Sequence, residues 1–187
     1  MKAKDILVPT ITLALIALVC SGLLVGTNEV TAETIEELQI ESDNESRAAV
    51  LPEADAFDDG QTIVIDEEEY TYWTADNGAG YVFSTSYKGY GGAVVVMTGI
   101  TADGEISGVE ITEQDETPGL GQRALEDEFR DQYVGEIPEE EFTVTKTGST
   151  ADNEIDALSG ATITSTAVTN SVNMAVTIYE TITGGAD

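Results

Sequence analysis

The chain has 187 residues, of which 36 are acidic and 7 basic, with one Cys and no His, and its formal net charge is −29. This composition excludes a Ser-His-Asp triad, a zinc site with the usual ligands and a Cys-ligated iron–sulfur cluster, so redox work by this chain needs an organic cofactor. The negative charge argues against nucleic acid as a partner, because nucleic-acid binding depends on Lys and Arg side chains that neutralise phosphates.

An apolar segment near the N-terminus predicts a single membrane-spanning helix over residues 6–26. No charged residue occurs from Ile6 to Asn28, and about 20 apolar residues span a bilayer as a helix. Lys2 and Lys4 precede the segment and an acidic flank follows it, which predicts a cytoplasmic N-terminus and an extracytoplasmic domain at the cell membrane. The alternative is a cleaved signal peptide, for which the apolar stretch is long and Val30-Thr31-Ala32 is a poor cleavage site.

Residues 34–51 predict a helix that leads away from the membrane and ends at Pro52, since acidic residues alternate there with apolar ones. We therefore expect a transmembrane anchor at 1–28, a helical connector at 29–60 and one further domain at 61–187.

The acidic residues are spread along the chain, which predicts a strongly hydrated surface suited to salty surroundings. The run from Asp55 to Asp66 has the length of a calcium-binding loop. Phe57 occupies a ligand position there and residues 62–65 are typical of a strand, so no metal site is predicted.

Short runs of β-branched and aromatic residues predict strands at 62–65, 70–73, 81–87 and 93–100. The turn signal Asp103-Gly104 predicts that residues 105–112 return as the antiparallel partner of 93–100.

The second half of the domain predicts helices beside this sheet. Leu125, Phe129 and Tyr133 recur every four residues and predict an amphipathic helix, while 142–147 predicts another strand. The last helix is predicted from about Ala161, and its apolar face consists of Val168, Val172, Ala175, Val176 and Tyr179. Antiparallel hairpins with flanking helices predict an α+β fold.

The segment Asp156-Ala-Leu-Ser-Gly-Ala-Thr162 leads directly into the last helix. Gly160 and Ala161 let a bulky group approach the backbone, and Thr162 offers a nucleophilic oxygen. The free N–H groups of a helix start suit a phosphate. An ordinary helix N-cap accounts for the same small and hydroxylated residues.

Residues 156–162 resemble the flavinylation motif of the FMN-binding domain family, Asp-x-x-Ser/Thr-Gly-Ala-Thr/Ser. The resemblance implies that flavin mononucleotide (FMN) is joined through a phosphoester to Thr162 by a separate flavin transferase. It also implies that Asp156 belongs to the recognised motif and that Ser159, Gly160 and Ala161 bind the cofactor.

A second segment, Glu116-Thr117-Pro118-Gly119-Leu120-Gly121, resembles a signature of the G subunit of the Rnf complex and of the C subunit of the sodium-pumping quinone reductase. Pro and two glycines predict a tight, open loop whose amides can face a planar ring. A plain turn explains the Pro and Gly but not the adjacent Glu-Thr. The predicted cofactor-binding residues of this loop are Glu116, Thr117, Gly119, Leu120 and Gly121.

Two further features have open interpretations. Residues 89–94, Gly-Tyr-Gly-Gly-Ala-Val, also resemble the start of the FMN-binding domain, but a loop that allows close approach of strands explains them equally well. Lys146 either points at the flavin or lies at the edge of its predicted strand.

The resemblance extends over nearly the whole chain, and its length fits the Rnf G subunit better than the longer quinone-reductase protein. It implies an electron-relaying subunit, without catalytic residues or independent activity, of a membrane complex that couples ferredoxin oxidation and NAD reduction to Na⁺ or H⁺ translocation. The implied partners are the other membrane and redox subunits. The alternatives are a C-type quinone-reductase subunit, an anchored acidic surface protein without flavin, and a free-standing flavin reductase.

Overall fold

The structure, a computed structural model, describes residues 3–184. It contains two compact units, one up to Asp43 and one from Asn44 onward. Residues 3–43 of the first unit are all helical. The second holds the sheet and the remaining elements.

Helix α1 runs from Ala3 to Val50 without interruption. Its segment Leu7–Ala32 has a mean hydropathy of 2.4, is not buried by the described residues, and is long and apolar enough to cross a membrane. The predicted anchor and the helix predicted at 34–51 are thus parts of one helix, because the residues that join them contain neither Gly nor Pro. The helix ends two residues before Pro52, as predicted.

The domain is built on a six-stranded antiparallel sheet with the strand order β1-β2-β3-β4-β5-β6. The strands are β1 Gln61–Ile65, β2 Glu68–Thr74, β3 Gly80–Lys88, β4 Ala93–Thr101, β5 Glu105–Glu113 and β6 Gly135–Glu136. The predicted hairpin at Asp103-Gly104 is confirmed, with the Gly104 N–H donating to the Thr101 carbonyl at 3.1 Å.

Alternate residues of the strands fill two separate cores, as the two-residue period of a strand requires. Phe83 of β3 and Val96 of β4 belong to the main core, whereas their neighbours Val82 and Met97 face the opposite side of the sheet. There they pack with Val50 and Leu51, so the end of α1 and the residue after it supply part of the domain's interior.

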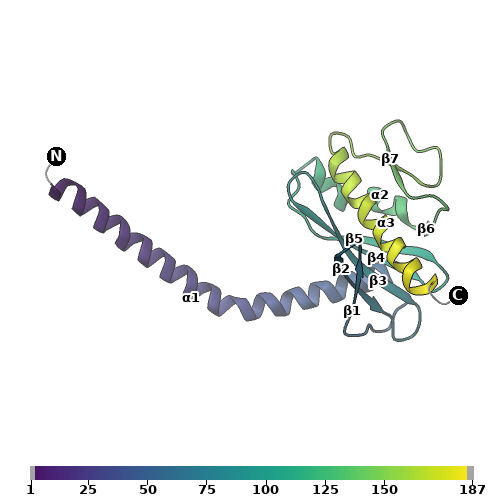
Figure 1. Ribbon diagram of the computed structural model, residues 1–187, viewed down its shortest axis with the longest axis horizontal. Helices are drawn as coiled ribbons and strands as arrows, with labels where there is room; N and C mark the ends of the chain where they lie inside the picture. The colour runs from purple at the N-terminus through teal and green to yellow at the C-terminus, as the bar shows by residue number, and fades with distance from the viewer. Residues whose placement is uncertain (1–2, 185–187) are drawn as a thin grey trace. The chain divides into compact units, whose positions relative to one another are not determined.

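Helix α3, Thr162–Gly184, packs across β3 and β4 on the side of the main core (Figure 1). Val168, Val172 and Ala175 of the predicted apolar face are fully buried. The predicted Val176 and Tyr179 are partly buried at the margin of that core, and Ile178 is buried. The helix start agrees with the prediction to within one residue.

The predicted helix around Leu125, Phe129 and Tyr133 is wrong in its extent. The structure has three short pieces there, the 3-10 helix η1 Gly121–Leu125, the helix α2 Asp127–Arg130 and the 3-10 helix η2 Asp131–Tyr133. Glu126 is extended, with ψ 137°, and interrupts the helix, so Phe129 and Tyr133 are buried while Leu125 is 40% exposed.

A small parallel sheet leads into α3. Strand β7, Thr143–Thr145, pairs with β8, Glu154–Asp156. The strand predicted at 142–147 is therefore present but shorter. Strand β8 ends at Asp156, which is the first residue of the 156–162 segment that leads into α3. Pairing with β7 therefore fixes the backbone where this segment begins.

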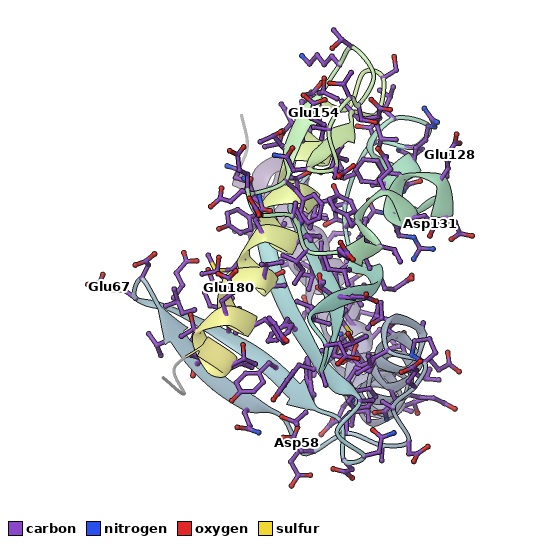
Figure 2. The ribbon with its side chains drawn as sticks, turned by 90° about the vertical axis from the view of Figure 1, so that its right-hand side faces the viewer. Asp58, Glu67, Glu128, Asp131, Glu154 and Glu180 are labelled. Atoms are coloured by element: carbon purple, nitrogen blue, oxygen red, sulfur yellow. The ribbon has the colours of Figure 1, made fainter. Side chains whose placement is uncertain are left out.

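Many acidic side chains of the domain are exposed at its surface. Figure 2 shows Asp58, Glu67, Glu128, Asp131, Glu154 and Glu180 spread around its periphery rather than gathered on one face. The predicted hydrated coat thus matches the distribution of charge over the domain.

Candidate functional site

A cavity of about 540 Å³ lies where three segments of the domain meet. The loop after β3, the segment that leads into η1 and the start of α3 supply its walls. It is lined by Tyr90, Glu116, Thr117, Leu120, Gly121, Gly160, Ala161, Thr162, Ile163 and Thr164. Its volume falls within the range of about 300–1,000 Å³ that is usual for small-molecule sites.

The start of α3 owes its shape to Gly160 and Ser165. Gly160 has φ +79°, a left-handed conformation that favours glycine. The Ser165 hydroxyl is fully buried, where it accepts from the Leu158 N–H at 3.0 Å and donates to the Ala161 carbonyl at 3.1 Å. These bonds hold residues 158–161 in a tight turn directly before Thr162.

Thr162 is the first residue of α3 and is half-buried in the cavity wall. Among residues 3–184, no hydrogen-bond acceptor serves the backbone N–H groups of Thr162, Ile163 and Thr164, whereas the Ser165 N–H donates to the Ala161 carbonyl at 3.0 Å. Unsatisfied N–H groups at a helix start carry partial positive charge and suit an anionic ligand.

Glu116 supplies the acidic group among the described residues that line the cavity, and only 3% of its surface is exposed. Its Oε1 accepts from the Gly91 N–H at 3.0 Å, and its Oε2 accepts from the Thr164 hydroxyl at 2.6 Å. The carboxylate therefore joins the loop after β3 to the first turn of α3.

Three glycines near Glu116 lack the Cβ atom that would collide with the Glu116 side chain or with the adjacent backbone. A Cβ on Gly121 would lie 2.5 Å from Glu116 Oε2 and 2.7 Å from Thr164 Oγ1. A Cβ on Gly89 would collide with Glu116 Oε1, and one on Gly91 with the Asp115 carbonyl. Gly119 differs, because its φ of +75° demands glycine while open space surrounds it.

Most of the residues predicted to bind a cofactor come together at this cavity. Its lining includes seven of them, namely Glu116, Thr117, Leu120, Gly121, Gly160, Ala161 and Thr162. Gly119 lies within the loop without lining the cavity, and Lys146 follows β7 outside it.

Asp156 and Ser159 line a second hollow, of about 450 Å³, together with Arg123 and Gln132. The Asp156 N–H donates to the Gln132 side-chain oxygen at 2.7 Å, and the Asp156 carboxylate accepts from the Ser149 hydroxyl at 3.5 Å. The two ends of the 156–162 segment thus line different hollows, with Thr162 in the first and Asp156 in the second.

Sequence reasoning did not single out Tyr90, Ile163 or Thr164 as site residues. Tyr90 and Ile163 are largely apolar groups at the cavity with 72% and 55% of their surface exposed. Lys88 was also missed, and it lines a hollow of about 220 Å³ together with Thr162, Ile163 and Asn170. Tyr90 lies within residues 89–94, the stretch that resembles the start of the FMN-binding domain, and Lys88 directly precedes it. This proximity was the one feature of the sequence that could have identified them as site residues.

Comparison with known proteins gives consistent results over most of the chain. The FMN-binding domain family matches residues 89–177, and the family described as the RnfG N-terminal region matches residues 1–48.

The G subunit of the Na(+)-translocating ferredoxin:NAD(+) oxidoreductase complex of Acetobacterium woodii is 40% identical, with 91% of this chain and 89% of the relative covered. The G subunit of the proton-translocating ferredoxin:NAD(+) oxidoreductase complex of Clostridium ljungdahlii is 34% identical, with coverages of 83% and 82%.

The crystal structure of the C subunit of the Na(+)-translocating NADH-quinone reductase of Parabacteroides distasonis is similar in fold, with a TM-score of 0.57 at 18% identity. The match covers 75% of this chain and 93% of that one.

Proposed function

The chain belongs to the family of G subunits of ion-translocating oxidoreductase complexes, and on this premise we propose that it is a membrane-anchored flavoprotein that relays electrons within such a complex. Its relatives are named as components of ferredoxin:NAD(+) oxidoreductases, one translocating Na⁺ and another protons. The function proposed here is therefore electron transfer coupled to Na⁺ or H⁺ movement, in assembly with the other membrane and redox subunits.

FMN is the cofactor, and the cavity at the start of α3 is its proposed site. The matched FMN-binding domain includes all three segments that line the cavity. The cavity is large enough for a drug-sized ligand, and it combines apolar groups such as Leu120 and Ile163 with unpaired backbone N–H groups. Bound FMN would supply the capacity to take up and pass on electrons singly or in pairs.

We propose a covalent bond between the FMN phosphate and Thr162 Oγ1, made by a separate flavin transferase. The observation that carries this assignment is the position of Thr162, which lines the cavity at the start of α3. Three backbone N–H groups at this helix start have no acceptor among the described residues. These N–H groups would hold the phosphate oxygens. Asp156, in the second hollow, remains available to the transferase.

The proposed cofactor contacts divide between the two ends of FMN. Ser159, Gly160 and Ala161 form the turn at the phosphate end. Thr117, Gly119, Leu120 and Gly121 form the loop proposed to face the ring, with Glu116 behind it and Lys146 as a more distant candidate.

The anchor, proposed as residues 1–28, places the N-terminus in the cytoplasm, and the connector 29–60 leads to an extracytoplasmic FMN-binding domain at 61–187. Support for this orientation comes from the basic residues before the apolar segment Leu7–Ala32 and the acidic residues after it.

The covalent bond is tested by Thr162→Val, which keeps the shape of the side chain and removes its oxygen. The full chain, expressed with a flavin transferase, should show flavin fluorescence that survives denaturing electrophoresis, and the variant should lose it. Thr162→Ser should retain part of the signal. Thr166→Val is the matched control, because Thr166 lies one turn later, is exposed and bonds only the Thr162 carbonyl, at 2.9 Å. Fluorescence that persists in Thr162→Val would overturn the assignment.

A further inference from the structure

The buried carboxylate of Glu116 has no basic partner among the described residues. The ion pairs found in residues 3–184 involve Arg123 and Arg130, which bind other carboxylates. Glu116 is instead held by the Gly91 N–H and the Thr164 hydroxyl. A buried charge is costly unless hydrogen bonds compensate it, and these two hydrogen bonds supply that compensation at Glu116.

The surrounding sequence is shaped to accommodate this carboxylate. Gly89 and Gly121 leave the space that Glu116 Oε1 and Oε2 occupy, and Gly91 lets the backbone of Asp115 approach the loop after β3. The Glu116 N–H donates to the Gln114 side-chain oxygen at 2.6 Å, which fixes the backbone from which the carboxylate projects. Both glycine-containing loops of the cavity thus converge on one side chain.

The hydrogen bond from Thr164 to Glu116 lies in the same helical turn as Thr162. Residues two apart on an α-helix are separated by about 200° around its axis. Thr164 is 1% exposed and faces Glu116, so the first turn of α3 is held at a rotation that leaves Thr162 half-buried in the cavity wall. The hydrogen bond thus connects Glu116 to the helical turn that carries Thr162.

Building on the proposed function, we propose that Glu116 is a positioning residue of the flavin site, which orients Thr162 for modification and holds a fixed negative charge at the cavity wall that lowers the flavin's midpoint potential. The positioning follows from the two hydrogen bonds that join the cavity walls. The effect on potential follows because each electron added to the flavin is repelled by a nearby carboxylate, and burial reduces the screening of this repulsion by water.

The electrostatic part is tested by Glu116→Gln in the full chain, purified in detergent with covalent FMN. The amide preserves the size of the side chain and can accept from Gly91 and donate to Thr164, but it removes the charge. Its flavin midpoint potential, measured by spectroelectrochemical titration, should shift upward. Glu113→Gln removes the same charge from an exposed side chain three residues away and should leave the potential near that of the wild type.

The positioning part is tested by the initial rate of flavinylation. Thr164→Val removes the donor to Glu116 and should slow flavinylation about tenfold, the effect of losing one hydrogen bond to a charged group. Thr164→Ser restores the hydroxyl and should restore the rate. Glu116→Ala should be at least as slow as Thr164→Val. If this variant does not fold, the two Thr164 variants still decide the question.

The proposal is overturned in its electrostatic part if Glu116→Gln keeps the wild-type potential, or if Glu113→Gln shifts the potential as much as Glu116→Gln does. It is overturned in its positioning part if Thr164→Val is modified as fast as Thr164→Ser. A wild-type chain that carries no covalent FMN would instead refute the proposed function, and the two failures are therefore distinguishable.

Discussion

At the scale of single residues, Lys88 shares a hollow with Thr162 and Ile163, whereas Lys146 lies beyond β7 and lines none of the hollows described around Thr162. In a chain with a formal net charge of −29, a phosphate that approaches Thr162 is repelled by most of the surface. The charge of Lys88 opposes that repulsion locally.

We expect Lys88→Met to slow flavinylation of the full chain by up to about fivefold, the equivalent of an exposed ion pair. Lys146→Met is the comparison variant, since it removes the same charge from a residue outside this hollow, and it should slow the reaction less than Lys88→Met. Time courses of in-gel flavin fluorescence at low ionic strength measure both. A wild-type rate in Lys88→Met would remove Lys88 from the site, and a Lys146→Met chain slower than Lys88→Met would favour Lys146 instead.

The residues that sequence reasoning identified are those whose role is local. Thr162 follows a short segment of small residues, and its position at a helix start depends on its immediate neighbours. Thr164 was missed because its role depends on Glu116, 48 residues away in sequence. Gly121 was interpreted as part of a tight loop and Gly89 as part of a stretch that allows close approach of strands, whereas both make space for Glu116, a contact that no local pattern encodes.

At the scale of elements, the five long strands were predictable from their runs of β-branched and aromatic residues, and the last helix from its apolar period. The segment around Leu125 was not, because a four-residue spacing of three side chains did not reveal the extended backbone at Glu126. The small strands β6 and β8 are two and three residues long and have no periodicity to detect.

The turn between β1 and β2 offers a test of element stability. Asp66 and Glu67 join the paired residues Ile65 and Glu68, and their φ angles are 51° and 70°. A two-residue turn with both φ values positive is best served by Gly at its second position. Glu67 is exposed there and adopts a conformation that costs a non-Gly residue about 1–2 kcal/mol.

We predict that Glu67→Gly raises the free energy of unfolding by about 0.5–1 kcal/mol, because the greater freedom of unfolded glycine offsets part of the relieved strain. The corresponding rise in Tm is about 2 °C. Glu67→Gln removes the same charge without relieving the backbone and should gain less. Thermal unfolding followed by circular dichroism measures the Tm of the wild type and both variants. A rise in Tm in Glu67→Gln equal to that in Glu67→Gly would attribute the effect to charge alone.

At the scale of the whole molecule, the dispersed acidic surface governs how the domain responds to salt. Like charges oppose compaction, and their repulsion is screened over about 30 Å at 0.01 M ionic strength but only about 3 Å at 1 M. The Tm of the chain in neutral detergent should therefore rise with added sodium chloride. Choline chloride should have the same effect if screening is responsible, whereas a Tm that stays flat or falls in both salts would refute this account.

The orientation of the chain is a second property at this scale. A Glu-specific protease added to right-side-out vesicles should digest the domain, because the basic residues before the apolar segment favour a cytoplasmic N-terminus. Digestion only in inverted vesicles would reverse the proposed topology. A cytoplasmic marker protein that stays intact serves as the control for sealed membranes.

The attachment of FMN to Thr162 is tested most directly by peptide mass spectrometry of the wild-type chain. Residues 147–187 contain no Lys or Arg, so cleavage by trypsin after Lys146 leaves Thr162 on the peptide that begins at Thr147. We predict that this peptide is heavier by the mass of FMN less one water, and that fragmentation places the added mass between Ala161 and Ile163. An unmodified peptide from a host that has the transferase, or the added mass on Ser159, Thr164 or Ser165, would contradict the account.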